Sequence, residues 1–259
     1  MATVRANGRA FHVQTLGRGA PMAMVHGLVF GNLSSWYLTV APRLARNRKV
    51  LLYDLRGHGR SEPATEGFRL ADMAADLAAL IEAAPEFEPP VDLVGHSYGG
   101  LIPLQLALNR PDLVRRVVVV DAPVPPFHQS DLDAFVPVDP ESLLHDIPQA
   151  AEFLSALPES LRANVTGERR QRRRREDLAR FRDETSVLDD LKAEPPLAVE
   201  RIDRPVLCVY GRTSPFREKG ERLAAAIPGA RLSLLEAGHV IPYEAPAELA
   251  REIDGFLDG

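Results

Sequence analysis

A serine between two glycines, set where an apolar strand meets a helix, constrains this chain more than any other feature. The segment Gly95-His-Ser97-Tyr-Gly99-Gly100 directly follows the aliphatic run Val91–Val94 and directly precedes a stretch of helical character, Leu101–Asn109. In that context, Gly-x-Ser-x-Gly is typical of a sharp turn that presents the serine hydroxyl at the edge of a sheet. Glycine on either side lets the backbones approach closely. Ser97 is therefore the candidate nucleophile.

Short aliphatic runs alternate with helical stretches on both sides of this turn. Runs bounded by glycine or proline favour strands buried on both faces, and a strand–helix alternation predicts a mostly parallel sheet covered by helices. The strands are expected at Phe11–Leu16, Met22–Val25, Val50–Tyr53, Val91–Val94, Val117–Val120, Pro205–Tyr210 and Ala230–Leu235. The helices are expected at Ser34–Ala45, Leu70–Ala84, Leu101–Asn109, Glu218–Ala226 and Ala247–Leu257.

The alternation stops after Asp121 and resumes at Pro205. Between them the sequence shows no convincing strand, and prolines separate short helical segments. A chain of 259 residues suits one α/β domain with an inserted lid. We therefore expect an α/β core formed by residues 1–122 and 205–259, with a helical lid at about 123–204.

Four further motifs stand in a fixed order around the serine turn. They are His26-Gly27 with Ser34-Ser-Trp36 after it, Asp54-Leu-Arg-Gly-His-Gly-Arg-Ser61, the serine turn itself, and Gly238-His239 after the last strand. With them, the chain resembles the α/β-hydrolase superfamily, in its serine-nucleophile branch, over nearly its whole length. The resemblance implies a mostly parallel central sheet flanked by helices, with a helical lid inserted after the sixth core strand.

The resemblance also implies the other groups of an acyl-transfer site. Of the seven histidines, only His239 follows the last strand, where a base can accept the Ser97 proton and later protonate a leaving group. Two backbone N–H groups must hold the developing oxyanion. One is expected from Tyr98, the residue after the nucleophile, and the second from Leu28, just after His26-Gly27. The alternative for Leu28 is a plain turn residue.

The orienting acid is where the sequence departs from the family pattern. The acid usually follows the strand that here ends at Tyr210-Gly211, but the chain reads Gly211-Arg-Thr-Ser214. A serine cannot carry the charge that stabilises an imidazolium, so replacing Ser214 should leave turnover nearly intact. The run Val117–Val120 leads straight into Asp121, where some members of the superfamily carry their acid. We therefore predict Asp121, with a turn or helix-cap aspartate and a Ser–His dyad as alternatives.

Composition limits the partners. A formal net charge of −5 argues against nucleic acid as a partner, although the run Arg169–Arg175 departs locally from that balance. A solvated helix face is the first interpretation of the run, and docking of a phosphate-bearing carrier is the second. One cysteine, an N-terminus without the apolar core of a signal peptide, and no long apolar run predict a cytoplasmic protein without a membrane segment.

The predicted function is hydrolysis of a carboxylic ester or thioester through an acyl-enzyme on Ser97. The substrate is expected to be a small acyl compound, free or carrier-bound, and neither a cofactor nor a metal is expected. A serine nucleophile argues against the epoxide hydrolase and dehalogenase branches, which use a carboxylate. Lactone or carbon–carbon bond hydrolysis, and acyl transfer or perhydrolysis on the same triad, stay open. So does a non-catalytic ligand-binding role. Substrate identity and oligomeric state stay unassigned.

Overall fold

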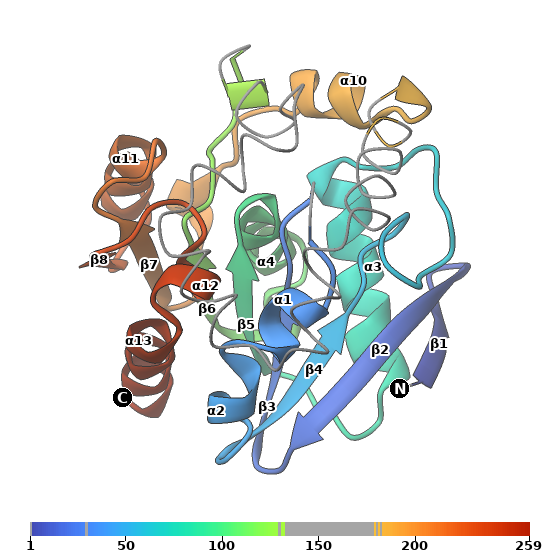
Figure 1. Cartoon of the computed structure of the whole chain (residues 1–259), viewed down its shortest axis with the longest axis horizontal. Coiled ribbons are helices and arrows are strands. Elements are labelled where there is room, and N and C mark those ends of the chain that lie inside the picture. The colour runs from blue at the N-terminus through green and yellow to red at the C-terminus, as the bar shows by residue number, and fades with distance from the viewer. Residues whose placement is uncertain (1, 29–30, 129–130, 133–178, 180, 182) are drawn as a thin grey trace, which may run out of the picture.

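An eight-stranded sheet, parallel except at one edge, forms the centre of the molecule (Figure 1). The computed structural model describes residues 2–28, 31–128, 131–132, 179, 181 and 183–259. The strands are β1 (Ala2–Ala6), β2 (Arg9–Gly17), β3 (Ala20–Val25), β4 (Arg48–Tyr53), β5 (Val91–His96), β6 (Val114–Val120), β7 (Val206–Gly211) and β8 (Arg231–Leu235).

The strand order is β1-β2-β4-β3-β5-β6-β7-β8, with β1 and β2 antiparallel to their neighbours and all later pairs parallel. The seven predicted strands and the mostly parallel sheet are confirmed. The prediction missed β1 because its residues include the polar Thr3 and Arg5 and are largely exposed at the sheet edge. Since parallel strands end at the same edge, β5, β6 and β8 deliver their following loops close together.

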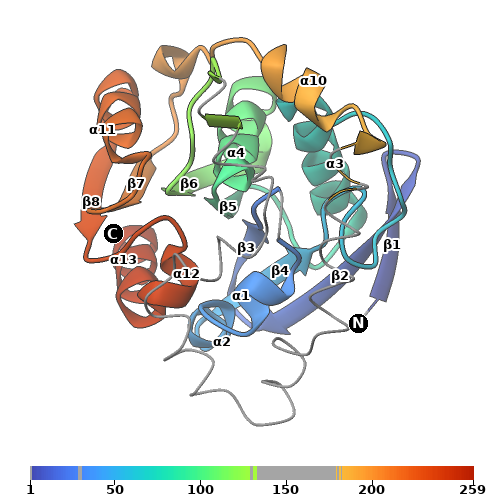
Figure 2. The same ribbon diagram turned by 45° about the horizontal axis from the view of Figure 1, so that its top comes forward.

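Helices cover both faces of the sheet and bury a separate apolar cluster on each (Figure 2). One face carries α3 (Leu70–Ala83), α4 (Tyr98–Asn109) and α11 (Arg217–Ala226), and the other carries α1 (Ser34–Tyr37), α2 (Ala41–Leu44), α12 (Ile241–Glu244) and α13 (Pro246–Asp258). The N- and C-termini lie near opposite edges of the sheet (Figure 1).

One helix prediction was wrong. Ser34–Ala45 was expected as a single helix, but the segment forms α1 and α2 with a break between them. Pro42 has no N–H to donate to the carbonyl four residues earlier, which disfavours a continuous helix through this position. The same residue fits the first turn of α2, where the N–H would have no intrahelical partner. The short α12 was not predicted.

The chain leaves the sheet after β6 and returns to it at β7. Most of the predicted lid, 123–204, including Arg169–Arg175, lies outside the described residues. Before β7, the described residues of this region form α10 (Val187–Lys192) and a 3₁₀ turn, Val199–Arg201. Backbone N–H groups of Phe68 and Leu70 donate to the carboxylates of Asp190 and Glu194, each at 3.0 Å. The returning chain thus caps the start of α3. No described helix combines the length and apolarity needed to span a bilayer.

Candidate active site

Ser97 occupies a strained turn between β5 and α4. Its φ of 55° and ψ of −137° lie outside the regions that non-glycine residues favour, and such strain is often found at functional sites. The turn is held by a 2.9 Å hydrogen bond from the Ser97 N–H to the Val120 carbonyl on β6. A Cβ added at Gly95 would overlap with the Gly99 carbonyl oxygen, and one added at Gly99 would overlap with the His26 carbonyl oxygen. Only glycine fits at either position.

His239 joins Ser97 to a carboxylate. Its Nε2 lies 3.2 Å from Ser97 Oγ, and its Nδ1 lies 2.7 Å from Asp121 Oδ2. Because the carboxylate only accepts, Nδ1 carries the proton and Nε2 is left to accept from the Ser97 hydroxyl. Asp121 is fully buried, whereas the His239 side chain is 25% exposed. The three residues, predicted from three separate segments, therefore meet in a Ser–His–Asp arrangement.

Asp121 is fixed by its backbone and by both carboxylate oxygens. It follows β6 with φ of 45°, and its N–H donates to the Val209 carbonyl at 2.8 Å. Oδ1 accepts from the Gly211 N–H at 2.8 Å, and Oδ2 accepts from Ser214 Oγ at 2.5 Å as well as from His239. Ser214, at the position where the family usually carries its acid, is thus a hydrogen-bond donor to the Asp121 carboxylate.

The two N–H groups expected at the oxyanion position lie at or just beyond the ends of two different secondary-structure elements. Tyr98 is the first residue of α4, where a helix leaves its first N–H groups without intrahelical acceptors. Leu28 follows β3. In the described part of the chain, no backbone acceptor outside the regular elements pairs with either N–H. Their assignment to the oxyanion stays a prediction.

Buried histidines shape the loop that carries Leu28. His26 donates from Nδ1 to the Gly27 carbonyl at 2.8 Å and accepts at Nε2 from the Leu55 N–H at 2.9 Å. Burial is the main cause that lowers the pKa of His26 to about 3, so the ring is neutral and this tautomer is fixed. His58 contacts the Leu28 carbonyl through Nε2. His26 and His58 therefore organise the turn that carries Leu28.

Sequence reasoning missed two residues that contact the His239 loop. His96 donates from Nε2 to the His239 carbonyl at 2.8 Å, and the two rings lie 5.0 Å apart. Burial is the main cause that lowers the pKa of His96 to about 3. The Glu244 carboxylate accepts from the N–H groups of Gly238 and Val240. No sequence signal singles out Glu244, because its contacts depend on the turn into the four-residue α12.

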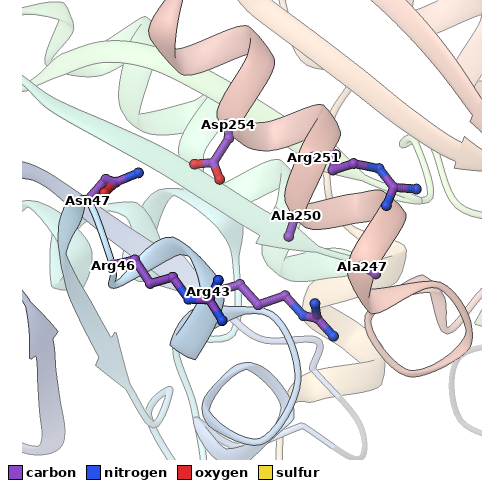
Figure 3. Close-up of a pocket in the computed structure, with 7 residues that line it drawn as sticks. All are labelled: Arg43, Arg46, Asn47, Ala247, Ala250, Arg251 and Asp254. Atoms are coloured by element: carbon purple, nitrogen blue, oxygen red, sulfur yellow. The ribbon is translucent and has the colours of Figure 1, made fainter.

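A separate hollow lies between α2 and α13 (Figure 3). It has a volume of about 250 Å³, and its lining includes Arg43, Arg46 and Asp254. Asp254 is 3.4 Å from Arg48, and the neighbouring Arg251 pairs with Glu248 at 3.0 Å. None of the Ser97, His239 or Asp121 side chains lines this hollow. Within the described ranges, no group of three or more metal-ligating side chains could hold an ion.

The fold, the strained serine turn and the Ser–His–Asp contacts together define a class of hydrolase. The model of the Alpha/beta hydrolase family matches residues 22–252, so the chain belongs to the α/β-hydrolase family. A relative from Pseudomonas savastanoi pv. phaseolicola named "Putative carbamate hydrolase RutD" is 30% identical over 92% of this chain and 94% of its own length. The 2-hydroxymuconate semialdehyde hydrolase of Pseudomonas sp. CF600 is 37% identical, over 44% of this chain and 41% of its own length.

Several of the curated relatives are thus matched over less than half of their own length. Solved structures are matched over the whole chain. The enol-lactonase from Burkholderia xenovorans LB400 superposes with a TM-score of 0.75 at 22% identity, covering 100% of both chains. A hydrolase from Pseudomonas aeruginosa PA01 gives a TM-score of 0.73 at 25% identity, covering 100% of this chain and 98% of that one. At identities this low, the likeness to these structures shows a shared fold and carries no information on the substrate.

Proposed function

We propose that this protein is a serine hydrolase that cleaves carboxylic esters or thioesters through an acyl-enzyme on Ser97. The observation that carries the proposal is the continuous contact from Asp121 Oδ2 through His239 to Ser97 Oγ, at 2.7 and 3.2 Å. In this scheme Ser97 is the nucleophile, His239 the general base and Asp121 the acid that holds the His239 tautomer. The backbone N–H groups of Tyr98 and Leu28 hold the oxyanion.

Acylation transfers one proton and exchanges one bond. Ser97 Oγ attacks the acyl carbon while His239 Nε2 takes the hydroxyl proton, and the carbonyl oxygen becomes an oxyanion between the two backbone N–H groups. When the tetrahedral intermediate collapses, the bond to the alkoxide or thiolate breaks, and the His239 imidazolium gives its proton to that leaving group. Asp121 stays ionised throughout and stabilises the imidazolium.

Deacylation repeats the steps with water as the nucleophile. His239 removes a proton from water, the hydroxyl attacks the acyl-enzyme, and the carboxylic acid is released as Ser97 recovers its proton. An amine, alcohol or peroxide in place of water would give an acyltransferase or perhydrolase with the same residues. Competition between water and an added acceptor separates these activities.

A second candidate is hydrolysis of a lactone, a carbamate or a carbon–carbon bond next to a carbonyl. It is supported by the names of the matched proteins, which include a lactonase, a carbamate hydrolase and a semialdehyde hydrolase. All three reactions pass through attack on a carbonyl carbon, so the Ser97 geometry serves each of them. Esters and thioesters rank first because the proton held by His239 is all that their alkoxide or thiolate leaving group needs in order to depart.

The test is covalent labelling with a fluorophosphonate, with Ser97→Ala as the matched control. We expect an adduct that mass spectrometry maps to Ser97 and that the variant lacks. A folded protein that forms no adduct would instead support the non-catalytic ligand-binding role. A panel of an aryl ester, an acyl thioester, a lactone, a carbamate and a vinylogous β-diketone then ranks the bond types by kcat/KM.

A further inference from the structure

The loop that carries His239 is held at its backbone as well as at its side chain. Glu244 Oε2 accepts from the Gly238 N–H at 2.6 Å, and Oε1 accepts from the Val240 N–H at 3.1 Å. One carboxylate therefore bridges the residues before and after the base. The His239 carbonyl between them accepts from His96 Nε2 at 2.8 Å.

We propose that Glu244 is a positioning residue for the catalytic base: its carboxylate fixes the backbone on both sides of His239 so that Nε2 faces Ser97. The proposal deepens the proposed function and rests on it. Charge-assisted hydrogen bonds from backbone N–H groups to a carboxylate are about twice as strong as neutral ones. Two of them, on amides that flank one residue, restrain the position of its Cα.

Gly238 fits this arrangement because the carboxylate approaches its backbone closely. A Cβ built at Gly238 would lie 3.2 Å from Glu244 Oε1 and 3.4 Å from Oε2. Both distances are at or below the lower end of ordinary contacts, so a Cβ here would require the carboxylate to shift by a few tenths of an ångström. Glycine at position 238 lets the carboxylate keep its place against the two amides.

Within the part of the chain that the structure describes, no cation competes for the Glu244 carboxylate. Among the described residues it forms no ion pair within 4.0 Å, and its hydrogen bonds are those to Gly238 and Val240. Glu248, four positions later on α13, differs in this respect, because it is exposed and pairs with Arg251 at 3.0 Å. The pair of acids therefore offers a test residue and a matched control that lose the same charge.

The base needs this second restraint because its own side chain is the least buried of the three. His239 is 25% exposed, whereas Asp121 is fully buried and Ser97 is 8% exposed. Asp121 restrains the His239 ring at Nδ1 only. A backbone shift of the loop would move Nε2 relative to Ser97 Oγ, and a misplacement of about 1 Å lowers a rate by roughly 100-fold.

The experiment compares Glu244→Gln with Glu248→Gln in the full chain. Glutamine keeps the volume of residue 244, but its amide offers one acceptor and turns a donor toward the other N–H. We expect Glu244→Gln to lower kcat on an aryl ester, and the rate of Ser97 labelling by a fluorophosphonate, by about 10- to 100-fold with KM changed less than about twofold. Glu248→Gln should match the wild type. Melting curves confirm that both variants are folded at the assay temperature.

Three results would overturn the inference. If the labelling rate and kcat of Glu244→Gln lie within about twofold of the wild type, the inference is wrong and the proposed function is unaffected. Failure of the wild type itself to react at Ser97 would contradict both the inference on Glu244 and the proposed function. Amide hydrogen exchange on the wild type covers the case in which Glu244→Gln does not fold. The N–H groups of Gly238 and Val240 should exchange slowly, and fast exchange at both contradicts the proposed restraint.

Discussion

Ser214 Oγ donates a 2.5 Å hydrogen bond to Oδ2 of Asp121, the same oxygen that accepts from His239 Nδ1. The residue that stands at the usual acid position of the family is therefore in direct contact with Asp121, the acid of the proposed mechanism. Its hydroxyl also accepts from the Phe216 N–H at 3.0 Å, which fixes the direction in which it donates. Ser214 thus supports the acid at the end of the neighbouring strand.

This contact changes what we expect of Ser214→Ala. On sequence alone the substitution should leave turnover nearly intact, but loss of a hydrogen bond to a buried carboxylate should lower kcat about 3- to 10-fold. Asp121→Asn removes the charge and should lower kcat by about 10⁴-fold, as loss of the acid's charge does in serine-protease triads. The measurement is kcat of both variants on one ester. A larger loss in Ser214→Ala than in Asp121→Asn would refute Asp121 as the acid.

Buried neutral histidines should make the protein less stable below pH 6.5. The pKa values of His26 and His96 fall from 6.5 to about 3, mainly through burial. Between these values the unfolded chain binds protons that the folded chain does not, so the free energy of unfolding decreases as the pH falls. At pH 5 each histidine should account for a loss of about 2 kcal/mol relative to neutral pH.

Urea unfolding at pH 7 and pH 5 measures this loss. In His96→Gln the difference between the two pH values should shrink by about 2 kcal/mol, because the titrating group is gone. His128→Gln is the control, since His128 is exposed. An unchanged difference in His96→Gln would show that His96 is not held neutral by burial.

Arg56 should matter for stability and not for chemistry. Its guanidinium makes a bidentate contact with Asp76, at 2.6 and 2.8 Å, and both side chains are buried. Removing the cation leaves a buried carboxylate without its charge partner, which costs about 3–5 kcal/mol. We therefore expect Arg56→Ala to lower the free energy of unfolding by that amount, while kcat measured well below the melting temperature stays near the wild-type value.

Chemical denaturation of Arg56→Ala beside Arg222→Ala checks the prediction. Arg222 is 78% exposed and pairs with Glu218 at 3.4 Å, so its loss should change stability by less than about 1 kcal/mol. Equal effects of the two substitutions, or a steep loss of kcat in folded Arg56→Ala, would contradict a structural role for the turn Asp54–Ser61.

Local patterns were enough to predict most of the fold and the three residues that meet at the site. The central strands β3, β4, β5, β6 and β7 are mostly apolar and buried, which is what burial on both faces of a sheet requires. Asp121 was found because Val117–Val120 runs directly into it, and His239 because it follows the last strand. Each of these signals lies within a few residues of the feature that it predicts.

Features that depend on distant chain segments escaped the prediction. The contact of Ser214 with Asp121 joins two loops 93 positions apart, and that of His96 with His239 joins the end of β5 to a loop 143 positions away. No short pattern encodes either distance. Glu244 lies only five positions after His239, yet its role depends on the turn into α12, which a four-residue helix does not announce through periodicity.

The position of the acid at the end of β6 divides the site unevenly along the chain. Ser97 and Asp121 precede the insertion, whereas His239 comes 118 positions after Asp121. During translation the nucleophile and the acid leave the ribosome long before the base does. Under the proposed mechanism, a nascent or prematurely terminated chain therefore holds two of the three groups and no activity. The enzyme becomes reactive toward acyl groups only when its last strand has joined the sheet.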